Sequence, residues 1–175
     1  MKKSIVPIAI LALTLSLTSC SKEIKAHEKV TVEKGQIAPS ITVGSTLGEL
    51  KVNDQFDKPH TIQETTKKVI FVFTKATGHL VKAYFNTQAV DYLEKNDIQF
   101  VADVSPMPKV ILEYIALKDL KKHKYPIMLI RDEKISPNFK NPENNEAIMI
   151  VNLDKLKVTG VKFVSNVEDF KSEIE

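Results

Sequence analysis

Val69-Ile70-Phe71-Val72-Phe73-Thr74-Lys75-Ala76-Thr77-Gly78-His79 is the stretch of sequence that decides the fold. Its first five residues are all apolar and rich in β-branched and aromatic side chains, which predicts a strand covered on both faces of a sheet. After the polar break at 74–79, apolar residues recur at helical spacing up to Asn96, a residue type that often ends helices. They are Leu80, Val81, Tyr84, Phe85, Ala89, Tyr92 and Leu93. The stretch therefore predicts a buried strand that leads into a helix.

The residues on either side continue this pattern. Upstream, Leu50 and Val52 alternate with polar residues, and the chain turns at Pro59 in a predicted hairpin. Downstream, Ser105 and Pro106 predict the N-cap and first turn of a second helix. The inward face of that helix is expected to comprise Val110, Ile111, Tyr114, Ile115 and Leu120.

Further strands are expected at 98–104, 127–130, 147–151 and 158–164, and a closing helix is expected to begin near Val167. Strands in alternation with helices predict right-handed βαβ units, to which the terminal hairpin adds antiparallel strands. The fold class predicted from these elements is α/β.

Composition limits the classes of protein to which the chain can belong. The 175 residues include 25 Lys and Arg, 22 Asp and Glu, and a single cysteine, Cys20. Without Lys2 and Lys3, which belong to an N-terminal signal, 23 basic residues balance 22 acidic ones. This balance provides no broad attraction to nucleic acid, so no nucleic-acid partner is expected. One cysteine cannot form a disulfide within the domain, so packing has to stabilise it.

The N-terminus has the features of a bacterial export signal. Lys2 and Lys3 precede an apolar run at 5–17, which is shorter than the roughly 20 residues that a membrane-spanning helix needs. The next residues, Leu17-Thr18-Ser19-Cys20, resemble the lipobox of bacterial lipoprotein precursors. The resemblance implies that residues 1–19 are a signal peptide and that acylated Cys20 holds the protein to the lipid bilayer. The alternative is an ordinary signal peptide followed by an unrelated cysteine.

Beyond the signal, residues 20–36 are rich in Lys and Glu and are expected to form a tether. Residues 37–175 are expected to form one domain, because about 130 residues suffice for a single core. Ser21 occupies the position at which lipoproteins retained in the inner membrane commonly carry aspartate. By this resemblance the expected location is the cell envelope, at the periplasmic face of the outer membrane rather than at the inner membrane.

The order of the predicted elements resembles the thioredoxin-like superfamily, in particular its periplasmic peroxiredoxin and cytochrome-maturation branch. Residues 43–59 are similar to that branch's opening hairpin, with a glycine, alternating apolar residues, an aspartate and a turn. Residues 147–155 resemble the strand and turn before the superfamily's last strand. The likeness covers about residues 43–175. It implies a three-layer fold with a central mixed β-sheet flanked by helices.

Two parts of the superfamily's redox site are missing here. In redox-active relatives a C-x-x-C motif lies at the turn from the first core strand into the first core helix, which corresponds to positions near Gly78 and Val81. Relatives also have a cis-proline before the penultimate strand, where this chain has Asn144-Asn145-Glu146-Ala147. The thiolate is the species that attacks disulfides and peroxides. Without a cysteine, thiol–disulfide exchange and cysteine peroxidase activity are excluded, and the domain resembles a cysteine-less periplasmic branch.

Residues 74–79 occupy the place of the active site in this fold. A helix N-terminus with Lys75, Thr77, Gly78 and His79 close by is a candidate site for a carboxylate or a phosphate. The simpler interpretation is that Thr77 caps the helix, Gly78 relaxes the turn and His79 lies in solvent. No catalytic residue is identified, because Ser105 has no recognisable base beside it.

Other polar residues offer weaker candidates. The four histidines, at 27, 60, 79 and 123, lack partners at a metal-ligand spacing, so no metal and no cofactor are expected. Lys118, Lys121, Lys122 and Lys124 are expected to form a solvated helix end, with contact to anionic headgroups as the alternative. Asp54, Asp103 and Asp154 end separate strands, and nothing in the sequence pairs them.

These observations lead to one main hypothesis, a non-redox binding or interaction module with a periplasmic protein partner. The alternative is a non-thiol enzyme or small-ligand binder that uses the turn from Lys75 to His79. A third hypothesis, suggested by the fold's relatives, is a metal or haem handler.

Overall fold

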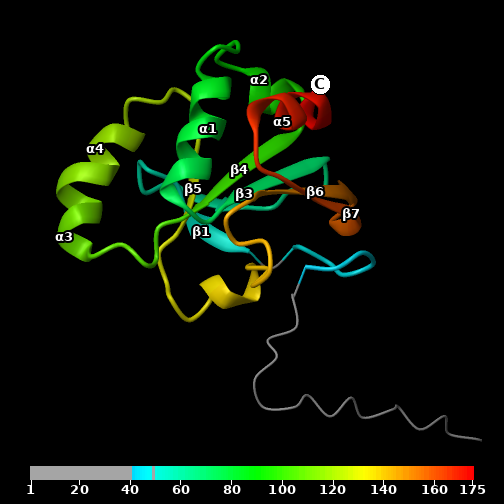
Figure 1. Ribbon diagram of the computed structural model, residues 1–175, viewed down its shortest axis with the longest axis horizontal. Helices are drawn as coiled ribbons and strands as arrows, with labels where there is room; N and C mark the ends of the chain where they lie inside the picture. Colours follow the sequence, from blue (N-terminus) through cyan, green and yellow to red (C-terminus); the bar gives the residue numbers. More distant parts are fainter. Residues whose placement is uncertain (1–40, 49) are drawn as a thin grey trace, which may run out of the picture. The chain divides into compact units, whose positions relative to one another are not determined.

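The computed structural model describes residues 41–48 and 50–175. The predicted signal peptide, the anchor Cys20 and the tether lie outside the described residues. The domain is built around a five-stranded sheet in the order β5-β4-β3-β6-β7 (Figure 1). Its strands are β5 (Met128–Ile130), β4 (Ile98–Asp103), β3 (Lys68–Val72), β6 (Ile148–Asp154) and β7 (Lys157–Val164). A separate hairpin pairs β1 (Lys51–Asn53) with β2 (Pro59–Thr61).

The predicted central strand is β3. It runs parallel to β4 on one side, with Ile70 opposite Phe100, and antiparallel to β6 on the other, with Ile70 opposite Ile150. β5 continues the parallel half, and β7 continues the antiparallel half. The turn from β6 to β7 uses positive φ angles at Lys155 and Leu156, as a tight hairpin requires. The predicted mixed central sheet is confirmed.

The helices are α1 (Lys75–Phe85), α2 (Tyr92–Lys95), α3 (Lys109–Ile111), the π-helix η1 (Leu112–Ala116), α4 (Leu117–Leu120), the 3₁₀-helix η2 (Ser136–Asn138) and α5 (Val167–Ile174). Alternation along β3 divides the core in two. Ile70 and Val72 pack with residues of α1, α2, α4 and α5, including fully buried Phe170. Val69 and Phe71 face the other cluster. Its other members include Ile41, Leu47, Leu50 and Ile62, and Phe139 packs against it. Figure 1 shows α1 and α5 close together over the sheet.

The first predicted helix differs from the structure at both ends. It begins earlier, because Thr74 is the N-cap and its hydroxyl accepts a hydrogen bond from the Thr77 amide at 3.3 Å. The prediction that Thr77 caps the helix is therefore wrong. It also ends earlier, at Phe85, where the Thr87 hydroxyl donates to the Tyr84 carbonyl at 2.7 Å. Such local side-chain bonds compete with helix continuation, so residues 92–95 form a separate turn.

The second predicted helix differs more. Ser105 is not its cap: the helix begins at Lys109, while the buried Ser105 donates its amide to the Asp103 carboxylate at 2.9 Å. The predicted inward face is also wrong except for Leu120. The residues left outside the core are Val110 (66% exposed), Ile111 (41%), Tyr114 (68%) and Ile115 (61%). Leu112 and Leu117 are buried instead, together with the correctly predicted Leu120.

A wide turn explains why a different face of this segment is buried. In η1 the Leu117 amide donates to the carbonyl of Leu112, five residues earlier, instead of four as in an α-helix. A five-residue turn brings Leu112 and Leu117 to the same side, where both are buried. The regular 3.6-residue period used for the prediction does not hold across this turn.

Candidate ligand pocket

A cavity of about 820 Å³ lies between α1, the carboxyl ends of β3 and β4, and the segment α3-η1-α4, which is called the outer wall below. This volume is typical of pockets that enclose small molecules. In Figure 1 the outer wall is the light-green pair of helices beside α1.

The pocket has an apolar interior. From the strands and the segments next to them come Val72, Phe100, Ala102, Val104 and Ile127, and from the outer wall come Ile111, Tyr114, Ile115, Ala116 and Leu120. Gly78 of α1 lies opposite the outer wall and leaves room because it has no side chain. The wide turn of η1 places apolar side chains toward the cavity, and wide turns of this kind are frequent at functional sites.

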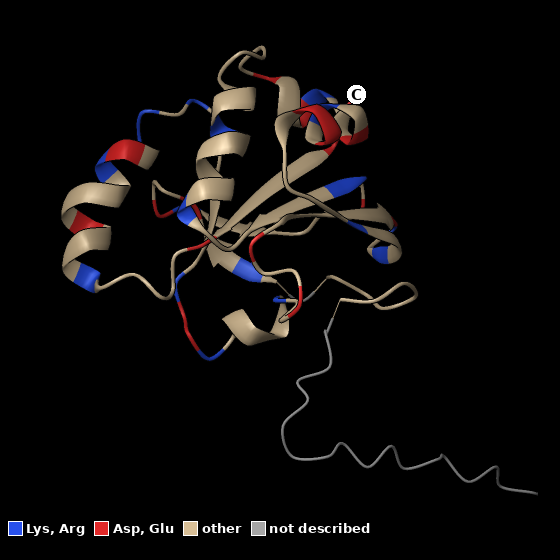
Figure 2. Cartoon of the chain, viewed as in Figure 1, with Lys and Arg blue, Asp and Glu red and all other residues tan. Residues whose placement is uncertain are grey.

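The charged residues of the pocket are mostly lysines. Lys75 and Lys82 come from α1, and Lys118 and Lys122 come from α4 and the turn after it. Asp119 accepts ion pairs from Lys82 at 2.9 Å and from Lys122 at 3.4 Å, which hold its pKa below the ordinary value against a smaller opposing effect of burial. Among the described residues, Lys75 and Lys118 form no ion pair. Figure 2 shows the basic residues along both α1 and the outer wall.

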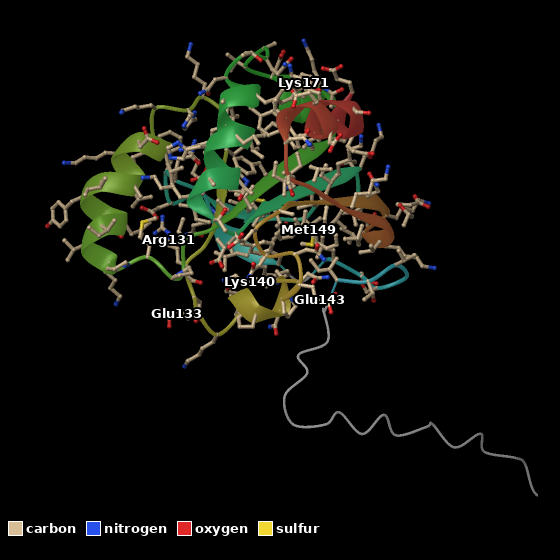
Figure 3. The ribbon with its side chains drawn as sticks, in the orientation of Figure 1. Arg131, Glu133, Lys140, Glu143, Met149 and Lys171 are labelled. Carbon is tan, nitrogen blue, oxygen red and sulfur yellow. The ribbon has the colours of Figure 1, made fainter. Side chains whose placement is uncertain are left out.

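Asp103 is the other acidic residue of the pocket, and its side chain is fully buried. One carboxylate oxygen accepts from Lys140 Nζ at 2.7 Å and from the Ser136 hydroxyl at 2.6 Å, and the other accepts from the Ser105 amide at 2.9 Å. Burial raises its pKa, but these donors outweigh burial and the net pKa is lowered. Asp103 thus fixes the loop that carries Lys140, labelled in Figure 3, to the end of β4. Each oxygen of this carboxylate accepts at least one hydrogen bond or ion pair, so its role is structural.

Three of the four predicted site residues meet at this pocket. Lys75, Gly78 and His79 all line it, and His79 is exposed. Thr77 does not line the pocket: it is buried, and its hydroxyl donates to the Thr74 carbonyl at 3.1 Å. His60 and His79 are not paired, because His60 Nε2 contacts the Asp54 carboxylate at 2.9 Å.

Of the lysine cluster predicted as a solvated helix end, Lys118 and Lys122 line the pocket while Lys121 and Lys124 do not. The outer wall was not predicted to form part of a site. The available signal was that residues 110–117 carry apolar side chains on nearly every side of the helix, more than one packed face needs.

Two features are absent from the part of the chain that the structure describes. Within 41–48 and 50–175, no group of three or more His, Cys, Asp or Glu side chains is arranged to hold a metal ion. In the same part of the chain, no helix has both the length and the apolar character needed to cross a membrane.

Comparison with solved structures identifies the fold as thioredoxin-like. A putative thioredoxin from Neisseria meningitidis matches with a TM-score of 0.52 at 13% identity, over 74% of this chain and 88% of that chain. A peroxiredoxin-like protein from Aquifex aeolicus matches with a TM-score of 0.51 at 9% identity, over 79% and 88%. Peroxidoxin BcpB from Mycobacterium tuberculosis matches with a TM-score of 0.50 at 11% identity, over 75% and 92%. At such identities the likeness shows the fold alone. No protein-family model and no curated protein matches the chain.

Proposed function

We propose that this protein is a non-redox binding protein of the cell envelope, anchored through acylated Cys20, whose thioredoxin-like domain binds an apolar ligand in the pocket between α1 and the outer wall. The observation that carries the proposal is the combination of an 820 Å³ cavity with a wall of exposed apolar side chains. Exposed apolar side chains gathered beside a hollow are typical of a binding site. The absence of cysteine from the domain supports binding in place of thiol chemistry.

A neutral apolar fluorophore, N-phenyl-1-naphthylamine, tests the proposal on the purified domain. We expect saturable binding that the double variant Ile111→Asp/Ile115→Asp abolishes, because two carboxylates would enter the apolar wall. Val110→Asp is the matched control: Val110 is 66% exposed on the same segment but does not line the pocket. Equal loss in the control and the double variant, or no binding to the unmodified domain, would contradict the proposal.

A second candidate function is the docking of a periplasmic protein on the exposed side of the outer wall. It is favoured by Val110, which is 66% exposed and lies outside the pocket lining. In this case Val110→Asp would release a partner co-purified from intact membranes with the acylated protein. Saturation with the neutral fluorophore would leave that partner bound if the two sites are separate.

The anchor has its own test. Mass spectrometry of the mature protein should show a diacylglyceryl group on an N-terminal Cys20, with residues 1–19 removed. Cys20→Ser should move the protein from the membrane fraction to the soluble periplasmic fraction. An uncleaved or unacylated N-terminus would overturn this part of the proposal.

A further inference from the structure

We infer that the ligand of this pocket is a single-chain amphiphile with an anionic head group, such as a fatty acid, whose chain lies against the outer wall and whose head meets Lys75 and Lys118. The inference rests on the proposed function and names the chemical class of the ligand. Three properties of the pocket lead to it.

The first property is the lack of available hydrogen-bonding groups in the interior. Phe100, Ala102 and Ile127 contribute apolar side chains there, and the hydroxyl of Thr74, which also lines the pocket, is already hydrogen-bonded to Thr77. The one interior acidic group, Asp103, already accepts from Lys140, Ser136 and the Ser105 amide. A polar ligand group placed beside it would lose water without gaining a partner. The interior is therefore suited to a hydrocarbon chain.

The second property is the charge around the interior. Four lysines line the pocket against two aspartates. Asp119 pairs with two of these lysines, Lys82 and Lys122, and Asp103 pairs with Lys140, which lies outside the lining. Among the described residues, Lys75 and Lys118 form no ion pair, and both are exposed. They come from opposite walls, one from α1 and one from α4. A ligand whose chain fills the pocket would place a carboxylate or phosphate between two cations, whereas a cationic head would be repelled.

The third property is size. A cavity of about 820 Å³ encloses a small molecule, while a protein partner would bury about 800 Å² of each surface over a broad patch. The wide η1 turn shapes the outer wall locally, next to the cavity. A small ligand therefore fits the hollow better than a macromolecular surface does.

The test compares three probes with the same chain on the purified domain by calorimetric titration: dodecanoate, dodecanol and dodecyltrimethylammonium, each below its micelle concentration. We expect dodecanoate to bind about tenfold more tightly than dodecanol, and the cationic probe to bind weakest. Lys75→Gln/Lys118→Gln should weaken dodecanoate binding about fivefold to tenfold and leave dodecanol binding unchanged.

The matched control is Lys157→Gln/Lys171→Gln, which changes the net charge equally at exposed positions outside the pocket. Figure 3 labels Lys171 on α5, on the other side of α1 from the outer wall. This control should bind dodecanoate as the unmodified domain does. Equal weakening in both double variants would show that net charge alone acts, and would overturn the inference.

Failure of the inference can be distinguished from failure of the proposed function. If all three probes bind equally and Ile111→Asp/Ile115→Asp abolishes their binding, the pocket binds apolar ligands but the anionic head group is wrong. If no probe binds, including N-phenyl-1-naphthylamine, the proposed function itself fails.

The source of the ligand, a free fatty acid or a bilayer lipid, is tested with vesicles of phosphatidylglycerol and of phosphatidylcholine. The concentration of free dodecanoate is held constant, because dodecanoate itself partitions into vesicles. Dodecanoate binding that vesicles do not displace supports a free fatty acid, whereas displacement by phosphatidylglycerol vesicles alone would show that a two-chain anionic lipid enters the pocket and would overturn the single-chain part of the inference. Equal displacement by both kinds of vesicle would overturn the requirement for an anionic head.

Discussion

Lys82 of α1 donates to Asp119 of α4 at 2.9 Å, and this ion pair joins the two helical walls of the pocket. The Lys82 side chain is only 12% exposed, so it lies between the helices, whereas Asp119 is 48% exposed. Because Leu120 anchors the same turn of α4 in the core, the pair and the core contact hold one end of the outer wall in place. The position of that wall sets the width of the pocket.

Removing this ion pair should loosen the outer wall. We expect Lys82→Met to lower the free energy of unfolding by about 1 kcal/mol and to accelerate amide hydrogen exchange at Leu117 and Leu120. The control is Lys95→Met, which removes the exposed Lys95–Asp91 pair within one helical turn and should cost less than about 0.5 kcal/mol. Equal exchange rates in the two variants would show that the Lys82–Asp119 pair does not hold α4.

Acid should destabilise the domain through Asp103. Its pKa is lowered in the folded state, so its stabilising contribution is present above the unfolded value of about 3.9 and is lost as the pH falls through the folded value. At pH 7 Asp103→Asn should cost about 2–4 kcal/mol, because Lys140 loses its buried counter-ion.

Urea denaturation between pH 7 and pH 3 measures this effect. The difference in free energy of unfolding between the unmodified domain and Asp103→Asn should narrow as the pH falls. Asp154→Asn serves as the control, since Asp154 is exposed at a strand end. A difference that stays constant across the titration would exclude Asp103 as the titrating group.

The sheet was predictable from sequence because its signals are local. The uninterrupted apolar run of β3 and the turn before β7 are determined by residues that follow one another in the chain. The parallel half of the sheet followed from the βαβ rule and the antiparallel half from the terminal hairpin, whereas the strand order β5-β4-β3-β6-β7 was not predicted. The position of the strand-to-helix junction was also predictable, but Lys75, Gly78 and His79 lie in the first turns of α1 and not in a turn before it.

The outer wall was not predictable from periodicity. Residues 110–117 are apolar on nearly every side, so two different faces satisfied the helical pattern equally well. The choice between them depends on the five-residue turn from Leu112 to Leu117, which no spacing rule anticipates. The ion pairs Lys140–Asp103 and Lys82–Asp119 could not be predicted either, because the two partners of each pair lie 37 residues apart in the sequence.

The fully buried amide of Gln55 should be essential for stability. Gln55 Nε2 donates to the Tyr125 carbonyl at 2.8 Å, and Gln55 Oε1 accepts from the Ile127 amide at 2.8 Å. Gln55→Leu keeps the volume but leaves both backbone groups unpaired, which should cost about 2–4 kcal/mol in chemical denaturation. Gln63→Leu, at an exposed glutamine, should change stability by less than about 0.5 kcal/mol. A small effect at both positions would mean that water replaces the amide of Gln55.

Gly78→Ala should stabilise the domain. The sequence suggested that Gly78 relaxes a turn, but Gly78 lies inside α1 and its amide donates to the Thr74 carbonyl at 3.0 Å. An added Cβ would lie 3.8 Å from Val72 Cγ2, an ordinary contact, so the gain in helix propensity should raise the free energy of unfolding by about 0.5–1 kcal/mol. Ala83→Gly, at an exposed position of the same helix, should lower it by a similar amount.

Gly78→Ala also tests whether the ligand lies against α1. Gly78 lines the cavity, so a methyl group there reduces the space available to a ligand. If the ligand approaches the α1 backbone, Gly78→Ala should weaken binding of N-phenyl-1-naphthylamine while the domain becomes more stable, and Ala83→Gly should leave binding unchanged. Opposite shifts of stability and affinity in one variant cannot come from partial unfolding, because partial unfolding would lower both. Unchanged binding in Gly78→Ala would place the ligand against the outer wall and away from α1.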